Sequence, residues 1–499
     1  RRDFMKGLGI LGTGLGTAAA TAPVFHDLDD IISSPKAEWK RPWWVKYREA
    51  DNPTTEIDWS LMNRWDARQT AQAPGIQAKY LGADEIKKRY ANVLTNKVKA
   101  ITHDTPGQTL RDYALSSGAG YFMNLPYVTT FMGPQKVATP QSLSVPVWQG
   151  TPEENSRMLR SAVIFYGGGQ VGFGVIDQKI KDKLVFTNHK GAANSIGFVE
   201  NFPPPPALGK SYLFEDVEQG YEGATTFVLP SNKQLYEFCF TVPMSKDMFR
   251  TTVPMSKDMF RTANESQIMY SANLSRYRLF GNIQNCIQEF IRSLGYTCYG
   301  YASPFSGMMP AIASAQLTGI TEGNRNNGFC TSPEYGPILG VFSLVTDMPL
   351  EPTNPIDAGI WRFCQTCTKC ADACPVNAIP KDHEPSWELP TVYGKPDITH
   401  SPGRKQYWTN ALDGWLFLTE YNGCGACMAT CTFNTNNAPI HELVRTTLAT
   451  TPLLNSFLWQ ADKFFGYGLT EDKEAWWDLS MPVYGFDSAA TSSQGGYNK

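Results

Sequence analysis

Hydrophobic and polar positions recur at helical spacing in several long stretches of this chain. From Asn273 to Leu294, apolar and aromatic side chains stand three or four positions apart, and Gly295 follows them. This spacing puts the apolar residues on one face of a helix, and glycine is a frequent stop signal after the last turn. We therefore predict a long amphipathic helix here, and a further helical stretch over 81–98.

The pattern changes from helical to strand spacing around a run of glycines. An amphipathic stretch from Glu153 to Ser161 leads into apolar residues 162–166, and apolar residues 171–176 follow the glycines. This order predicts a helix, a turn and a strand, the beginning of an α/β layer. The run either makes a tight turn or cradles a cofactor phosphate, although it lacks the spacing of a dinucleotide fingerprint. Its members are Gly167, Gly168 and Gly169.

One segment of the chain is duplicated. The sequence TVPMSKDMFRT occupies Thr241–Thr251 and again Thr252–Thr262. Repeat folds need several units, so one tandem copy does not indicate a solenoid. We predict that the duplication extends a loop, and we assign it no chemistry.

The first residues have the pattern of a twin-arginine (Tat) export signal. Arg1-Arg2 stands before a weakly apolar, glycine-rich stretch over 7–25, and acidic residues follow it. Such a stretch is a poor spanning helix; a basic terminus before a buried helix is the other interpretation. Tat export carries folded proteins, which suits a cofactor inserted before export.

With 499 residues, 42% of them hydrophobic, the chain can bury a large core. The formal charge of -3, with no long basic run, argues against a nucleic-acid partner. A proline-punctuated segment, 347–355, marks one boundary. The predicted units are 1–35, the signal and start of the mature chain; 36–150, an N-terminal unit; 151–350, the main domain; 351–450, a cysteine-rich domain; and 451–499, a C-terminal segment that packs on the core.

The 11 cysteines are distributed like metal ligands rather than disulfides. Four are scattered, at Cys239, Cys286, Cys298 and Cys330, and are typical of small buried hydrophobic residues. The other seven are concentrated in two motifs near the C-terminal end: Cys364, Cys367, Cys370, Cys374, Cys424, Cys427 and Cys431. Zinc would instead favour two separated cysteine pairs.

The first motif, C-x2-C-x2-C-x3-C-P, is the bacterial ferredoxin run, in which the fourth cysteine ligates the other of two [4Fe–4S] clusters. The second motif, C-x2-C-x3-C, has Tyr421 where a first cysteine is expected. Crossed ligation then gives one cluster Cys364, Cys367, Cys370 and Cys431, and the other Cys374, Cys424 and Cys427. The eighth ligand is a carboxylate, a displaced cysteine or an open [3Fe–4S] corner.

Taken in order, further segments resemble one family, the corrinoid-dependent reductive dehalogenases of organohalide-respiring bacteria. Besides the Tat start and both cysteine motifs, these segments are 160–176, FIRSLGY at 290–296, 319–325, TSPEYGP at 331–337, TDMPL at 346–350, FGYG at 465–468 and Trp476-Trp477. The resemblance implies an α/β (α+β) fold, with a nitroreductase-like corrinoid-binding domain at 151–350 followed by a ferredoxin-like domain with two [4Fe–4S] clusters at 351–450. It also implies a base-off corrinoid (cobamide), and none of the six histidines stands in an Asp-x-His-x-x-Gly context.

The resemblance also implies site residues. It assigns the proton donor to Tyr277, with Tyr270 as the alternative and a corrinoid contact, and the assisting basic residue to Arg325. A tyrosine, with an ordinary pKa of about 10, is a weak acid, so a cation that stabilises its phenolate raises its competence. Where the family has its missing cysteine, this chain carries Asp413, which either ligates iron or is simply solvated. The structural alternative for Tyr277 is a core aromatic, and for Arg325 a surface or carboxylate-paired arginine.

The expected function is respiratory reductive dehalogenation of small chlorinated alkanes or alkenes. The resemblance implies a position on the outer face of the cytoplasmic membrane, a small membrane anchor protein as partner, and electrons from the quinone-linked respiratory chain. Two alternatives are an epoxyqueuosine reductase-like corrinoid enzyme and an exported ferredoxin-type electron carrier.

Overall fold

The computed structural model describes residues 41–121, 130–133, 137–189, 195–200, 226–242, 259–305, 307–421, 423–434, 439–464 and 468–478. Residues 1–43 and 44–499 form two units, and the description below concerns the larger one. The predicted signal and most of the duplicated segment lie outside the described residues. In the described part, no helix combines the length and the apolar character needed to cross a bilayer.

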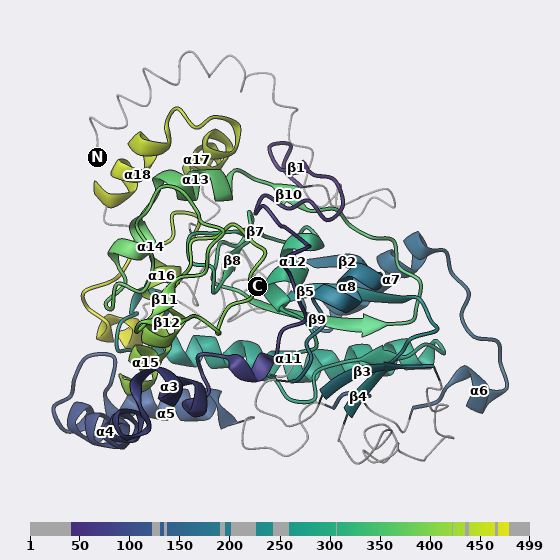
Figure 1. Ribbon diagram of the computed structural model, residues 1–499, viewed down its shortest axis with the longest axis horizontal. Coiled ribbons are helices and arrows are strands. Elements are labelled where there is room, and N and C mark those ends of the chain that lie inside the picture. Colours follow the sequence, from purple (N-terminus) through teal and green to yellow (C-terminus); the bar gives the residue numbers. More distant parts are fainter. Residues whose placement is uncertain are drawn as a thin grey trace, which may run out of the picture. The chain divides into compact units, whose positions relative to one another are not determined.

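A four-stranded antiparallel sheet, in the order β2-β5-β9-β6, lies at the centre of the fold (Figure 1). Its strands are β2 Val171–Ile176, β5 Leu235–Val242, β9 Gly340–Thr346 and β6 Cys298–Tyr299. Helices pack against this sheet, as expected for the α+β form of the predicted fold class. A separate parallel pair joins β3 Ser195–Val199 to β4 Thr226–Pro230.

Alternation along β5 builds a different core on each face of the sheet. Phe238 and Phe240 lie in one cluster with side chains of α7 (Pro152–Phe165) and α11 (Gln267–Ser293). Cys239 lies in another cluster with Ala315 of α12 (Ala311–Leu317). Successive strand residues point to opposite faces, so a single strand is buried from both sides.

The long helix predicted over 273–294 is confirmed as α11, but it begins earlier, at Gln267. Ser266 caps it by accepting a hydrogen bond from the backbone N–H of Met269, and Gly295 follows its end with φ +95°. In Figure 1, α11 runs alongside the sheet toward the cysteine-rich region. The C-terminal half of the helix therefore packs on the sheet, whereas its N-terminal half packs in a cluster with residues of the cysteine-rich region.

The helix, turn and strand predicted around the glycine run are also confirmed. Thr151, Pro152 and Glu154 start α7 with a capping box, and β2 follows the turn. The stretch predicted as helical over 81–98 lies mainly in α4 (Ala83–Thr102), which follows α3 (Pro74–Leu81).

The two copies of the duplicated sequence have different structural roles where they are described. Thr241 and Val242, from the first copy, end β5. Met259 and Phe260, from the second copy, are buried in a cluster with Met269 of α11. The described residues are the first two of one copy and the last four of the other, so no position of the repeat is described in both copies.

The N-terminal elements of the larger unit pack on later ones. Helix α5 (Leu110–Ala119) contacts α11, α4 contacts α15 (Ala411–Glu420), and β1 (Lys46–Tyr47) pairs with β10 (Ile356–Asp357). The elements not yet given in this part are η1 Ala67–Gln69, α6 Pro140–Leu143, α8 Gln178–Lys183, β7 Glu322–Gly323 and β8 Cys330–Thr331.

The cysteine-rich region consists of short helices joined by loops. Its elements are α13 Ile360–Thr366, α14 Lys369–Asp372, β11 Thr391–Val392, β12 Lys395–Pro396, α15 Ala411–Glu420 and α16 Ala426–Ala429. Then follow α17 Pro439–Thr450, α18 Asn455–Phe464 and η4 Glu474–Asp478. Near the end of the described chain, Trp476 and Trp477 pack on the cluster that contains Phe260.

Candidate active site

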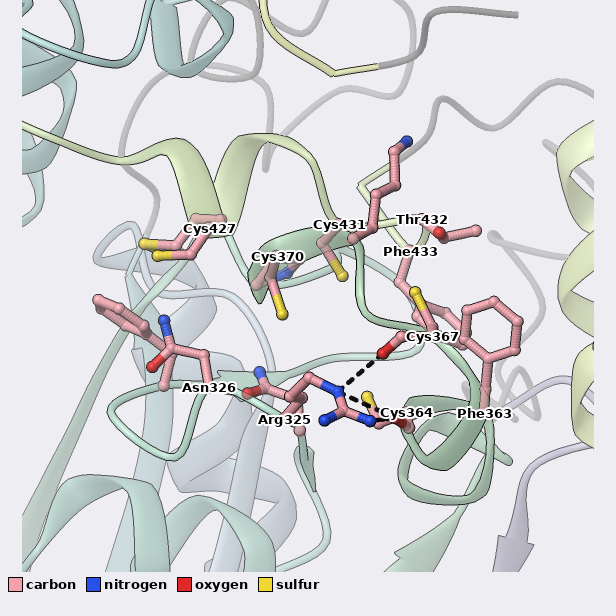
Figure 2. Close-up of a pocket in the computed structure, with 15 residues that line it drawn as sticks. Arg325, Asn326, Phe363, Cys364, Cys367, Cys370, Cys427, Cys431, Thr432 and Phe433 are labelled. Carbon is pink, nitrogen blue, oxygen red and sulfur yellow. Dashed lines mark hydrogen bonds between the residues drawn. The ribbon is translucent and has the colours of Figure 1, made fainter. Parts of the chain in front are cut away.

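Four cysteine side chains converge on one small pocket (Figure 2). Cys364 lies on α13, Cys370 on α14, and Cys367 and Cys431 in the loops that follow α13 and α16. These are the four thiols that the spacing assigns to one cluster. Cys427 also lines the pocket, but its side chain points away from the other four (Figure 2).

The surroundings of these four thiols suit a metal cluster. Burial, and then the neighbouring thiols, raise the pKa of Cys364 and of Cys370. A bound cation removes this penalty, because metal-bound cysteines are thiolates. No three His, Cys, Asp or Glu side chains of the described residues are placed to hold one metal ion. A cubane requires a wider spacing, because each thiolate binds a different iron atom.

Arg325 is fully buried beside this pocket, not beside Tyr277 as expected. Its guanidinium donates hydrogen bonds to the carbonyl oxygens of Cys364 (2.6 Å) and Cys367 (2.8 Å) (Figure 2). It also donates to two later carbonyls, those of Pro380 (2.9 Å) and Asp382 (2.6 Å). All these acceptors belong to the first cysteine motif and the loop after it, so Arg325 holds the cluster-binding loop in shape.

The other three cysteines line a much larger cavity, of about 470 Å³. Burial is the largest cause of a raised pKa at Cys424, to about 11, and at Cys427; the nearby Cys374 adds to both rises, and Cys424 adds to that of Cys427. This grouping agrees with the crossed ligation predicted from the spacing. The second cluster site therefore lies in the wall of the cavity.

Asp413, the expected eighth ligand, is not brought to these thiols. Its carboxylate accepts hydrogen bonds from the Tyr393 hydroxyl and from Nδ2 of Asn410 (2.6 Å). It lines a separate cavity at the surface, together with Arg89 and Glu420. Its position in the first turn of α15 explains this, since a carboxylate there stabilises the helix start.

The large cavity has mainly apolar walls, drawn from both halves of the larger unit. Among the described residues that line it there is no carboxylate, and two carry basic side chains, Arg276 and His400. Apolar lining side chains include Phe260, Met269, Leu274, Phe305, Ile312, Phe329, Leu339, Val341, Trp415 and Phe417. The volume and the few convergent polar groups are typical of a cofactor or ligand site.

Tyr277 lies in the wall of this cavity, as predicted, and its basic partner is the residue before it. The Nη2 of Arg276 is 2.9 Å from the Tyr277 hydroxyl, and the Tyr277 ring packs against Phe305. Tyr270, two helical turns earlier, also lines the cavity. Burial raises the pKa of Tyr270, the charge of Tyr277 adds to the rise, and Arg276 opposes it. Of these two tyrosines, Tyr277 is the one whose hydroxyl lies within hydrogen-bond distance of a basic side chain.

The glycine run is not part of this cavity, contrary to one of its two interpretations. The N–H groups of Gly167, Gly168 and Gly169 are bonded to the carbonyls of Ile164, Val163 and Thr241. With these donors used in the turn between α7 and β2, none is left for a phosphate. The structure supports the tight turn.

Comparisons with known proteins agree with this arrangement. The family model "Reductive dehalogenase subunit" matches residues 40–350, and "4Fe-4S double cluster binding domain" matches 363–434. The chain belongs to the reductive dehalogenase family. The chloroethene reductive dehalogenase of Dehalococcoides mccartyi strain VS is 30% identical over 98% of each chain. The trichloroethene reductive dehalogenase of D. mccartyi strain 195 is 27% identical over 97% of each.

A solved structure has the same fold. The catabolic reductive dehalogenase NpRdhA, in complex with 3-bromo-4-hydroxybenzoic acid, superposes with a TM-score of 0.55 at 15% identity, over 86% of this chain and 50% of that larger chain. The family, the fold class and the enzyme class predicted from the sequence are thereby confirmed. The domain boundaries stay predictions.

A reductive dehalogenase uses a corrinoid and two [4Fe–4S] clusters, and the residues present fit these groups. Four thiols surround one pocket, three more line the cavity wall, and the cavity itself suits a large apolar cofactor with a few polar groups. Cys374, Cys424 and Cys427 place the second cluster site in the wall of the cavity, whereas the four thiols of the first site do not line it.

Two residues of this dehalogenase's cavity were not predicted from the sequence. Arg276 stands directly before Tyr277 in the sequence, so it could have been considered as the basic partner of Tyr277. His400 stands in an Asp-x-x-His-x-x-Gly sequence, from Asp397 to Gly403, one residue longer than the pattern considered above. Its partner and its place on the wall depend on the fold between the two cysteine motifs.

A second cavity, the surface cavity that Asp413 lines, lies next to the large one. Two side chains, Val376 and Phe417, line both cavities. The Phe417 ring packs on Tyr421, with the ring centroids 4.8 Å apart. Val376 and Phe417 therefore separate the surface cavity from the large one.

Proposed function

We propose that this reductive dehalogenase removes halide from small chlorinated alkanes or alkenes. The observation that carries the proposal is the Tyr277–Arg276 pair on the wall of a mainly apolar cavity that also contains three cluster thiols. Small chlorinated hydrocarbons are neutral and apolar, and such walls bind them by excluding water. The names of the two full-length relatives, a chloroethene and a trichloroethene reductive dehalogenase, support this substrate class.

The overall reaction takes one proton and two electrons: R–Cl + H⁺ + 2e⁻ gives R–H + Cl⁻. When bound, the clusters and the corrinoid supply the electrons and the cobalt chemistry that breaks the carbon–halogen bond. The chain's own residues handle the proton. Tyr277 holds it on the hydroxyl oxygen at the cavity wall, and Arg276, 2.9 Å away, stabilises the phenolate that is left after transfer.

We further propose that the enzyme is exported by the Tat system and works on the outer face of the cytoplasmic membrane. The twin arginines before a weakly apolar stretch support this. A small membrane anchor protein and electrons from the quinone-linked respiratory chain complete the proposal. Fractionation of cells tests it: the enzyme is expected with the membranes, protected from protease in intact cells but accessible in spheroplasts. Recovery inside the spheroplasts would contradict it.

The substrate class is tested by chloride release. The purified holoenzyme, reduced with methyl viologen under anaerobic conditions, is offered chlorinated C1 and C2 compounds and, in parallel, halogenated phenols. We expect chloride from the small compounds and little from the phenols. Halide release from the aromatic compounds alone would refute the proposed substrate class and leave the dehalogenase assignment intact.

A further inference from the structure

A histidine–aspartate pair lies in the wall of the large cavity and has no part in the proton transfer described above. Nδ1 of His400 is 2.7 Å from Oδ2 of Asp397. The side chain of Asp397 is 1% exposed and that of His400 is 12% exposed. Asp397 also accepts hydrogen bonds from the backbone N–H and the hydroxyl of Thr399, both at 2.7 Å. Both carboxylate oxygens are thus in use: Oδ1 is held by Thr399, and Oδ2 orients the imidazole.

His400 lines the cavity, and Nε2 is the polar atom of the pair that this geometry leaves unused. Burial alone would raise the pKa of Asp397, but the hydrogen bonds from His400 and Thr399 outweigh it and lower the pKa. An ionised Asp397 fixes the proton of His400 on Nδ1. The ring packs edge-on against Trp408, with the centroids 5.5 Å apart. Within the described part of the chain, Nε2 has no hydrogen-bond partner.

The charges of the cavity favour an anion at this atom. The described lining contains two basic side chains and no carboxylate, and one of them, Arg276, directs Nη2 to the Tyr277 hydroxyl. With its one proton on Nδ1, the neutral ring only accepts at Nε2, so an anion there is bound together with a second proton. The ring then donates from both nitrogens, and the carboxylate behind it balances the charge. In a cavity of low polarity a charge-assisted hydrogen bond is stronger than in water.

We propose that His400, oriented by Asp397, donates a hydrogen bond from Nε2 to an anion bound in the cavity. Two anions of this chemistry belong in the cavity of a reductive dehalogenase. One is the phosphodiester of the corrinoid's nucleotide tail, and the other is the halide ion that the reaction releases. The halide source rests on the dehalogenase activity, whereas the phosphodiester source can be tested without turnover.

The phosphodiester source is tested by competition between two corrinoids. The full chain with both clusters is loaded with equal amounts of cobalamin and of cobinamide, which lacks the nucleotide tail, and the retained corrinoids are separated and measured. If His400 holds the tail, His400→Leu lowers the ratio of retained cobalamin to cobinamide by about tenfold or more. Asp397→Asn lowers it less, because the donor remains but is no longer fixed.

The halide source is tested by product inhibition. Bromide is added to the turnover assay at constant ionic strength. If His400 holds the halide, His400→Leu raises the bromide inhibition constant by about tenfold or more, and His400→Gln, which keeps a neutral donor, raises it less. His103→Gln is the matched control, because His103 is exposed at the end of α4.

A shift in either measurement, absent from the His103 control, supports the proposal and names the anion. Unchanged values in both measurements would overturn it. An equal loss of cobalamin and cobinamide with an unchanged bromide inhibition constant would also overturn it, since the histidine would then contact the corrin ring or merely support the wall. Iron content and circular dichroism of each variant show whether it is folded, and His400→Gln keeps the test valid if His400→Leu is not. A protein without turnover would leave the corrinoid competition fully informative.

Discussion

The Tyr277 hydroxyl accepts a hydrogen bond from Nη2 of Arg276, and this bond is the basis of its proposed role as proton donor. Tyr277→Phe removes the hydroxyl and leaves the ring that packs on Phe305. We expect iron and corrinoid contents to be unchanged and turnover to fall by about 10²- to 10⁴-fold, the usual contribution of a positioned acid. Turnover is measured as chloride release with reduced methyl viologen.

Tyr270→Phe is the matched control for this experiment, because Tyr270 lines the same cavity from the same helix. Its pKa is raised by burial, so it holds its proton more tightly, and we expect most activity to remain. If the two variants exchanged these outcomes, Tyr270 would be the proton donor.

Arg325 carries a buried charge that donates hydrogen bonds to backbone carbonyls of the cluster-binding loop and lies over the Tyr407 ring. Arg325→Lys keeps the charge but cannot reach several carbonyls at once, since lysine lacks the planar fork. Hydrogen bonds to charged groups are worth about 1.5–3 kcal/mol each, so the loop should lose more than one such contribution. We expect loss of the first cluster's iron during dialysis and a lower Tm.

Arg278→Lys, at an exposed position on α11, is the control for Arg325→Lys and should behave like the wild type. An Arg325→Lys protein that kept its iron but lost turnover would contradict the structural role. It would return Arg325 to the catalytic role implied by the family resemblance.

These residues also show what the sequence could and could not predict at this scale. The cysteine groups followed from spacing, because crossed ligation is a local rule of the ferredoxin motif. Arg325 and Asp413 are different, because their partners lie on loops and helices far along the chain or on a helix start that spacing does not reveal. Tyr277 was found through the resemblance. That its neighbour Arg276 turns its side chain to the Tyr277 hydroxyl depends on how α11 is oriented in the fold.

At the scale of elements, α15 forms the partition between two cavities. Phe417, on its inner side, lines both of them together with Val376. Phe417→Ala removes most of that partition, so bulkier chlorinated substrates should gain access. We expect kcat/KM for a bulky substrate, relative to a small one, to rise by about tenfold, the scale set by a few methylene groups in a pocket.

Phe417→Trp should change the same ratio in the opposite direction. Phe165→Ala, at an exposed position at the end of α7, is the control and should leave the ratio unchanged. An unchanged ratio in both Phe417 variants would show that substrates reach the cavity by another route.

Elements with strong periodicity were predicted well, because their apolar faces are written in the local sequence. Helices α7 and α11 are examples, although α11 starts six residues early at a serine cap. The antiparallel order of the sheet was not predicted. Strands β5 and β9 are about a hundred positions apart in the sequence, and the duplicated segment begins at the last two residues of β5, so no local signal fixes their register.

At the scale of the whole molecule, the two cluster sites differ in their relation to the large cavity: the three thiols of the second site line it, and the four thiols of the first site do not. Cys370 lines only the small pocket, whereas Cys424 lines only the large cavity. Removing one ligand from each site should therefore have different consequences for the corrinoid. We expect Cys370→Ser and Cys424→Ser each to lose up to about half of the iron. Cobalt content should stay near one per chain in Cys370→Ser and fall in Cys424→Ser, because only the second loss alters the wall.

Iron, cobalt and the corrinoid absorption of the anaerobically purified variants measure this difference. Cys286→Ser is the matched control, since Cys286 is exposed on α11 and belongs to neither site. Equal cobalt contents in Cys370→Ser and Cys424→Ser would contradict the order of the sites. The two clusters would then stand in the same relation to the cavity. The structure would give no reason for electrons to pass from the first cluster to the second before they reach the cavity.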